Sequence, residues 1–81
     1  MTNSALYLQG NYFFLIDAHC AESGRWEVDV TFSLCADYKQ TTGDIRKSMQ
    51  HMSATFPSEA IAHVQGCAWA RNEASRGIAG L

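Results

Sequence analysis

The chain has 81 residues and a formal net charge of −2, with 17% of its residues charged and 47% hydrophobic. This length and composition predict one small globular domain over residues 1–81, and they exclude both a disordered chain and a large enclosed pocket. The six basic residues are scattered apart from the pair Arg46 and Lys47. This scatter argues against a surface that follows nucleic-acid phosphates.

The N-terminal residues show no signal-peptide pattern, and the apolar run from Tyr12 to Ile16 is too short to span a bilayer. Three cysteines, Cys20, Cys35 and Cys67, are widely spaced and odd in number, as is typical of buried thiols in a reducing compartment. We therefore expect a cytoplasmic protein without membrane contact, disulfide framework or zinc motif.

An alternation of apolar and polar residues runs from residue 25 to residue 34 and predicts a strand with one buried face. Residues 12–20 are rich in aromatic and branched side chains, and residues 22–24 suit a three-residue loop with Gly24 in a left-handed conformation. The sequence thus predicts a hairpin over residues 12–35. A three-residue loop places every apolar partner on one face by pairing Cys20 with Trp26, Ala18 with Val28, Ile16 with Val30, Phe14 with Phe32 and Tyr12 with Leu34.

Residues 45–56 carry two competing patterns. Ile45, Met49, Met52 and Phe56 recur at helical spacing, whereas residues 52–56 alternate weakly. Because an isolated hairpin is marginal in water, a third strand at about residues 50–56 is the preferred interpretation.

A helix over residues 58–76 is predicted by Pro57 followed by the N-cap residue Ser58. Gly66 inside it indicates close packing against the sheet. Its core-facing stripe is expected to be Ile61, Val64, Cys67 and Ala68.

The predicted fold is α+β: an antiparallel three-stranded sheet, made of the hairpin 12–35 and a strand at about 50–56, packed against one C-terminal helix, 58–76. The helix is expected on the sheet face that carries Trp26, Val28 and Val30. Residues 36–44 are polar and predict a connection, and residues 77–81 are expected to be frayed.

The segment from Ala54 to Arg71, in which Phe56 precedes a Ser-capped helix and an Ala-Trp-Ala stretch follows, resembles the C-terminal half of certain small uncharacterised bacterial proteins. With some support from the Gly24-Arg25-Trp26 hairpin, the resemblance covers the last third of the chain. It implies a sheet-plus-helix fold and no activity. The short acidic format is also similar, in type only, to phage-encoded anti-defence inhibitors, including anti-CRISPR proteins.

The predicted register leaves a second sheet face, which carries the candidate partner-binding residues Phe13, Leu15, Asp17, Glu27 and Asp29. Apolar side chains rimmed by acidic ones are typical of a protein contact. The acidic rim favours a protein partner with a basic surface, which could be foreign or a second copy in a homodimer. The competing interpretation is that the connection or the third strand folds over Phe13 and Leu15.

Other chemistries have weaker support. Asp17, His19, Glu27 and Asp29 include the ligand types of a divalent metal, but a solvated sheet face is the more ordinary outcome for such residues. His19 and Cys20 are adjacent on a strand, so their side chains point to opposite faces and do not form a catalytic dyad. His51 and His63 are expected at the surface or hydrogen-bonded.

No phosphate loop, nucleophile elbow or dinucleotide motif occurs in the sequence. We therefore expect no enzyme, no cofactor and no metal, but a non-catalytic protein-binding module that inhibits or regulates its partner. The alternative is a small dimeric nucleic-acid-binding regulator that uses the sheet or Arg46, Lys47 and Arg71.

Overall fold

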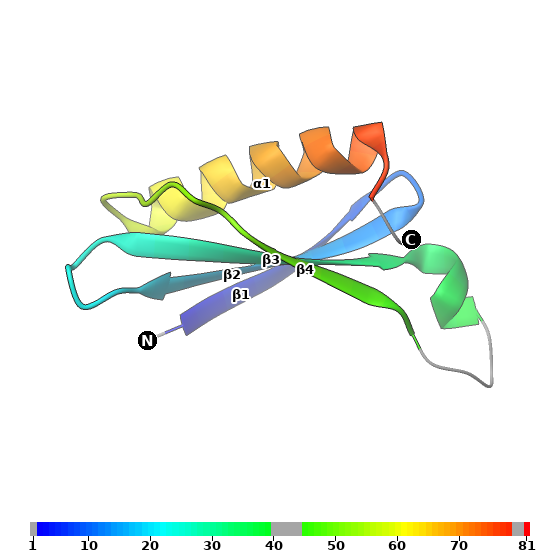
Figure 1. Ribbon diagram of the computed structural model, residues 1–81, viewed down its shortest axis with the longest axis horizontal. Coiled ribbons are helices and arrows are strands. Elements are labelled where there is room, and N and C mark those ends of the chain that lie inside the picture. The colour runs from blue at the N-terminus through cyan, green and yellow to red at the C-terminus, as the bar shows by residue number, and fades with distance from the viewer. Residues whose placement is uncertain (1, 40–44, 79–80) are drawn as a thin grey trace.

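Residues 2–39, 45–78 and 81 are described by a computed structural model, in which a four-stranded antiparallel sheet carries one long helix (Figure 1). The strand order β1-β2-β3-β4 follows the chain, so each strand lies beside its neighbours in sequence. The elements are β1 (Thr2–Gln9), β2 (Tyr12–Cys20), β3 (Trp26–Leu34), the 3₁₀ helix η1 (Cys35–Lys39), β4 (Lys47–His51) and α1 (Glu59–Arg76).

The hairpin of β2 and β3 has the predicted register. Cys20 lies opposite Trp26, Ile16 opposite Val30 and Tyr12 opposite Leu34. The turn between the strands carries Gly24 at φ 84°, a left-handed conformation that L side chains rarely adopt. These pairs confirm the predicted register. Its physical reason is that only this register keeps the apolar side chains of both strands on one face.

The prediction of three strands is wrong by one, because β1 was not expected. Tyr7 points to the inner face and stacks on Phe14 with ring centroids 5.3 Å apart, while Leu6 and Leu8 lie exposed on the opposite face. With apolar residues on both faces, the strand lacks the period-two signal on which sequence reasoning depends. A sequence signal did exist, because Gly10, at φ 59°, and the next residue form a two-residue loop between β1 and β2.

The strand predicted at about residues 50–56 begins and ends earlier, at Lys47–His51. Beyond it the chain stays beside β3, since Met52 N donates to Val28 O at 3.0 Å and Phe56 forms an isolated bridge with Trp26. Residues 53–55 lie outside the ladder. The helical alternative for this segment is therefore excluded, and the strand interpretation is correct in kind but displaced.

The C-terminal helix was correctly predicted, but its buried stripe was not. Ser58 is the N-cap and its Oγ accepts a hydrogen bond from Ile61 N at 3.2 Å. Ile61 and Val64 are 44% and 66% exposed, and the buried positions are the small residues Ala62, Gly66, Ala70 and Ala74. A row of small residues lets the helix backbone approach the sheet closely, which larger side chains at these positions would prevent.

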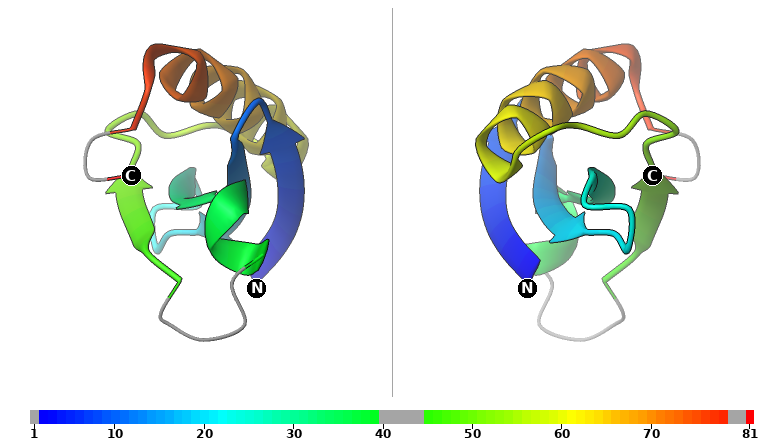
Figure 2. Two further views of the ribbon diagram at one scale, coloured as in Figure 1. Left: turned by 90° about the vertical axis from the view of Figure 1, so that its right-hand side faces the viewer. Right: turned by 90° about the vertical axis from the view of Figure 1, so that its left-hand side faces the viewer.

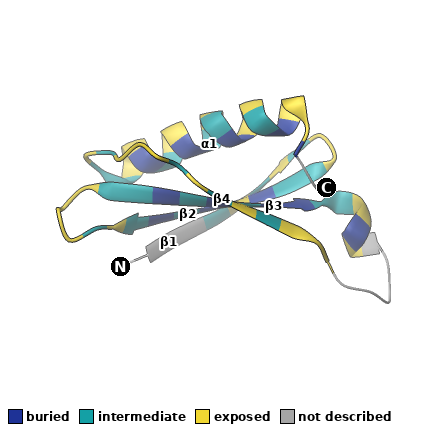
Figure 3. Cartoon of the chain, viewed as in Figure 1, coloured by how far each residue is buried: buried dark blue, intermediate teal, exposed yellow. Residues whose placement is uncertain are grey.

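The core lies between α1 and the inner face of β2 and β3 (Figure 3). Phe14, Ile16, Val28, Val30 and Phe32 are all fully buried there. Trp26 and Trp69 pack against this cluster from its edges.

The expectation that residues 77–81 are frayed is wrong for Ile78 and Leu81, which pack with the core, while residues 79–80 lie outside the described residues. Ile78 is only 4% exposed, and its backbone N–H donates to the hydroxyl of Tyr12 at 3.3 Å. Burial of an apolar side chain beyond the helix end therefore holds this part of the chain against the sheet. Of the predicted connection at residues 36–44, residues 36–39 belong to η1 together with Cys35 of the predicted hairpin, and residues 40–44 lie outside the described residues.

Candidate protein-binding face

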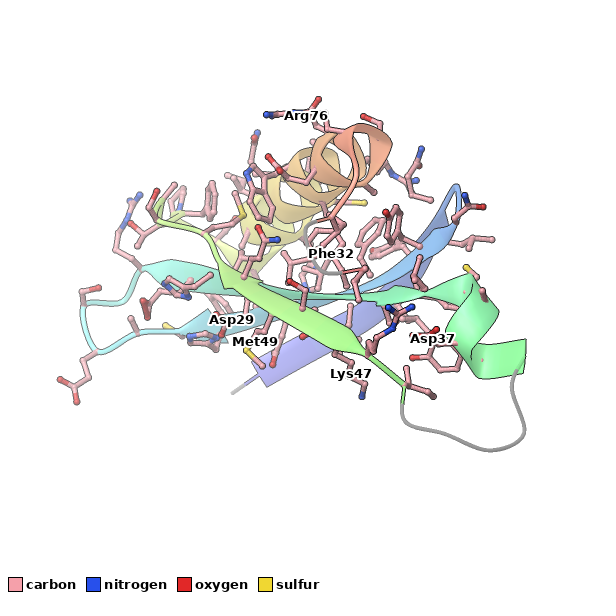
Figure 4. The ribbon with its side chains drawn as sticks, turned by 45° about the vertical axis from the view of Figure 1, so that its right-hand side comes forward. Asp29, Phe32, Asp37, Lys47, Met49 and Arg76 are labelled. Atoms are coloured by element: carbon pink, nitrogen blue, oxygen red, sulfur yellow. The ribbon has the colours of Figure 1, made fainter. Side chains whose placement is uncertain are left out.

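The outer face of the sheet is the face that points away from α1. The strand register aligns its side chains in rows, and one row runs from edge to edge through Leu6, Leu15, Thr31 and Met49. Leu6, Leu15 and Met49 are 63%, 37% and 72% exposed. With Leu8, which is 57% exposed beside Leu6 on β1, these three side chains form what we call the apolar band. Figure 4 shows Met49 and Lys47 on this side of the sheet, and Phe32 between sheet and helix.

Of the predicted site residues, Phe13 is not freely available. The ring of Tyr38 from η1 packs edge-on against it, with the ring centroids 5.1 Å apart. The Tyr38 hydroxyl also lies 3.2 Å from Ser33 Oγ, which is buried. The competing expectation that the connection covers part of this face is thus correct for Phe13, whereas Leu15 keeps its exposure.

An ion pair holds η1 in place. Arg46 Nε donates to Asp37 Oδ2 at 3.2 Å, and the backbone N–H of Arg46 donates to the same oxygen. Asp37 is buried, and its hydrogen bonds with the Arg46 side chain lower the pKa of its carboxyl below the usual range and raise the pKa of Arg46. Sequence reasoning missed this pair, since Asp37 lies within the predicted polar connection and Arg46 lies beyond its end.

The charged end of the outer face brings together residues from three strands, which we call the charged cluster: Asp17, His19, Glu27, Asp29 and His51. His51 Nδ1 lies 2.6 Å from Asp29 Oδ1, and His51 Nε2 lies 3.7 Å from Glu27 Oε1. His19 faces the same two carboxylates from the other side, at 3.6 Å from Glu27 and 3.7 Å from Asp29. The predicted juxtaposition of His19 with Glu27 is confirmed, and His51 is an addition that required the position of β4.

Asp17 completes the charged cluster from β2. It lies directly opposite Asp29, as predicted, and its Oδ1 is buried without a hydrogen-bond partner in the part of the chain that the structure describes. Two facing carboxylates repel each other mildly, which makes this end of the sheet receptive to a positive group. Among the described residues, no group of three or more His, Cys, Asp or Glu is arranged to hold a metal ion, so the metal interpretation gains no support.

A concavity lies between β1 and α1, apart from the outer face. It is a groove of about 400 Å³ lined by Tyr7, His63, Val64, Cys67, Ala68 and Arg71. The guanidinium of Arg71 sits 5.8 Å from the centre of the Tyr7 ring and donates to Gln9 Oε1 at 2.7 Å. These contacts tie α1 to β1. The Nε2 atom of His63 is buried without a hydrogen-bond partner among the described residues, contrary to the expectation of a surface or hydrogen-bonded histidine.

None of the three cysteines is part of a disulfide in the described residues. Cys67 is half-buried against the core, and Cys35 is half-buried in η1. Cys20 is exposed, so the expectation of a buried thiol is wrong there. Its position at the last residue of β2 explains this, because the hairpin end extends past the helix that covers the core.

The three basic residues of the nucleic-acid alternative, Arg46, Lys47 and Arg71, do not share one surface. Arg46 is paired with Asp37, and Lys47 lies in the outer-face row of Phe13 and Ser33. Arg71 lies on the helix side over the Tyr7 ring. The alternative that used Arg46, Lys47 and Arg71 together therefore lacks the single positive surface that phosphate contacts require.

No family model matches the chain, and neither the curated proteins nor the solved structures contain a significant match to it. No helix in the described ranges is long and apolar enough to cross a membrane.

Proposed function

We propose that the outer face is a protein-binding surface and that the chain acts as a non-catalytic module that inhibits or regulates its partner. The observation that carries this proposal is the apolar band, which crosses the sheet from Leu6 on one edge to Met49 on the other and adjoins the charged cluster. Thr31 of β3 lies between Leu15 and Met49 in this row. Exposed apolar side chains gathered beside charged ones are typical of the centre and rim of a protein interface.

The apolar band supplies the binding energy in this proposal. Full burial of a Leu or Met side chain is worth about 1.5–3 kcal/mol, and Leu6 and Met49 still have most of their surface to bury. Association itself costs free energy, which offsets part of this gain. The charged groups at the rim then decide which partners bind well enough to form the contact. Leu15 lies between these two residues in the same row and would be at the centre of the contact.

The charged cluster defines the chemistry of the partner. Among the described residues, the carboxylates of Asp17, Glu27 and Asp29 lie beside the two imidazoles of His19 and His51. Because the carboxylates outnumber the imidazoles, the cluster favours a partner whose apolar patch is flanked by Arg or Lys. A nucleic-acid enzyme has such basic surfaces in its substrate groove. An anti-defence inhibitor of the anti-CRISPR type, which would compete with phosphate there, belongs to the functions that this surface suits.

The test compares capture of protein partners from a bacterial lysate by wild-type chain and three variants, with mass spectrometry of the captured proteins. Leu15→Lys changes the apolar band, and Asp17→Lys combined with Asp29→Lys reverses the charged cluster. Val64→Lys is the matched control, because Val64 is 66% exposed on α1 and away from the outer face.

We expect a stoichiometric partner that binds the wild-type chain and Val64→Lys but is lost with both outer-face variants. Thermal unfolding must first show that each variant is folded. Capture that survives both Leu15→Lys and the double charge reversal would remove the outer face from consideration. Binding of oligonucleotides with a steep salt dependence would instead favour the nucleic-acid alternative.

A further inference from the structure

The two edges of the sheet are protected very differently. β4 is five residues long, carries Lys47 and His51, and is followed by residues 53–55 outside the ladder and by Pro57. Short length, lysine, irregular backbone and proline are the devices by which proteins prevent an edge strand from pairing with another chain. The β4 edge is thus closed to strand addition.

The β1 edge has none of these devices. β1 is eight residues long, and its sequence Thr-Asn-Ser-Ala-Leu-Tyr-Leu-Gln contains no charged residue and no proline. Its partner on one side is β2, and the backbone groups of its other side face no other strand of the sheet. A long edge strand without charged residues or proline is a template for another strand.

The β1 edge is also ordered by side-chain contacts within the chain. Tyr7 stacks on Phe14 at an interplanar angle of 24°, and Arg71 of α1 covers both rings and bonds to Gln9. These contacts fix β1 on the sheet although α1 itself lies over β2 and β3 (Figure 2). A pre-ordered edge loses little conformational entropy when a second strand is added.

We infer that β1 pairs antiparallel with β1 of a second copy of this chain, which joins the two sheets into one of eight strands. The strand is complementary to itself. When a two-fold axis passes through the pair of Leu6 residues, residues 3–9 of one copy pair with residues 9–3 of the other, and each Leu6 lies opposite its counterpart. Ala5 then meets Tyr7 of the other copy on the inner face. No charge is brought against a like charge, and the exposed Leu6 gains an apolar neighbour.

This pairing keeps both helices on the same side of the joined sheet, because directly opposed residues of antiparallel strands share a face. The outer faces then form one continuous surface in which the two apolar bands meet at the seam. The inference goes beyond the proposed function and does not depend on it. A dimer of this kind would present two copies of the outer face to a partner.

The test is light scattering after size-exclusion chromatography over a range of concentrations, on the wild-type chain and matched lysine variants. Leu6→Lys places two positive charges opposite each other at the seam. Met49→Lys is the control, since Met49 is at least as exposed as Leu6 and lies in the same outer-face row, but at the β4 edge. Leu8→Lys provides a second seam variant in case Leu6→Lys does not fold.

We expect wild type and Met49→Lys to have twice the 8.9 kDa mass of one chain, and the seam variants to lose the dimer at the same concentrations. Hydrogen exchange should show protection of β1 amides that increases with protein concentration. A wild-type chain that is monomeric at every concentration would overturn the inference. So would loss of the dimer in Met49→Lys, which would indicate stacking of outer faces, or a dimer without protection of β1.

Loss of partner capture in Leu15→Lys with an intact dimer would separate the two proposals, because Leu15 is on a central strand and not at the seam.

Discussion

A methyl group added at Gly66 has little space, because α1 lies close to the sheet there. A Cβ at this position would lie 3.0 Å from Val28 Cγ1 and 3.5 Å from Ile16 Cγ2. Carbon atoms pack best at about 3.5–4.0 Å, so the contact with Val28 is too short while the contact with Ile16 is ordinary. Gly66→Ala therefore tests whether the helix is seated as closely as the structure indicates.

Two effects of opposite sign decide the magnitude. Replacing glycine by alanine inside a helix stabilises it by about 1 kcal/mol. Overpacking a closed core costs about 1–3 kcal/mol. Val28 is fully buried, and because its β-branched side chain is restricted in χ1, it cannot easily turn away from an added methyl group. The net expectation is that Gly66→Ala lowers the free energy of unfolding by up to about 2 kcal/mol.

The assay is urea unfolding of four chains: wild type, Gly66→Ala, Val28→Ala and the double variant. In the Val28→Ala background the short contact is absent, so Gly66→Ala should now stabilise the protein by about 1 kcal/mol. The sign of the Gly66→Ala effect thus reverses between the two backgrounds. If Gly66→Ala stabilises the wild-type chain as much as the Val28→Ala chain, the close approach of helix and sheet does not exist.

Two further predictions concern the ends of the elements. Ser58→Ala removes the acceptor of the Ile61 N–H and should lower the free energy of unfolding by about 1 kcal/mol in urea titrations, with Ser58→Asp, which keeps an acceptor, close to wild type. Asp37→Asn should destabilise the protein at pH 7. Because Arg46 lowers the pKa of Asp37 in the folded state, this contribution is present above the ordinary aspartate pKa and is lost as the pH falls through the lowered value. Unfolding curves of Asp37→Asn and wild type should therefore converge in strong acid, and a difference that persists there would contradict the role of the ion pair.

The hairpin of β2 and β3 was predictable to the residue because the middle of one face is fully buried. A slip of one residue would move the apolar side chains of one strand into water, either Phe14 and Ile16 or Val30, and the loop at residues 22–24 allows only one register that avoids this. The charged cluster follows in part from the same register, since Asp17 with Asp29 and His19 with Glu27 are directly opposed. Local sequence therefore contained most of the geometry at this end of the outer face.

The remaining features depend on long-range packing that local patterns do not record. The helix stripe was misassigned because hydrophobicity favoured Ile61 and Val64, whereas close approach to the sheet selected Gly66 and the alanines. Tyr38 reaches Phe13 only because the Asp37–Arg46 pair fixes η1 against the sheet. His51 joins the cluster through the pairing of β4 with β3. Each of these contacts requires the three-dimensional arrangement before it can be recognised.

The dimensions of the elements explain why this fold leaves one face and one edge uncovered. A helix is about 10–12 Å wide, whereas adjacent strands are about 4.8 Å apart, so one helix covers little more than two strands. α1 lies over β2 and β3, the two central strands, and among the described residues only η1 packs on the opposite face, where Tyr38 covers Phe13. Within residues 2–39 and 45–78, no further helix or strand lies over Leu6, Leu15 or Met49. A partner on the outer face and a second copy at the β1 edge would each cover surface that these elements leave exposed. Leu6, Leu15 and Met49 lie in one row of side chains. Lysine substitutions along that row therefore test both proposals: Leu15→Lys tests the outer face, and Leu6→Lys with its control Met49→Lys tests the seam.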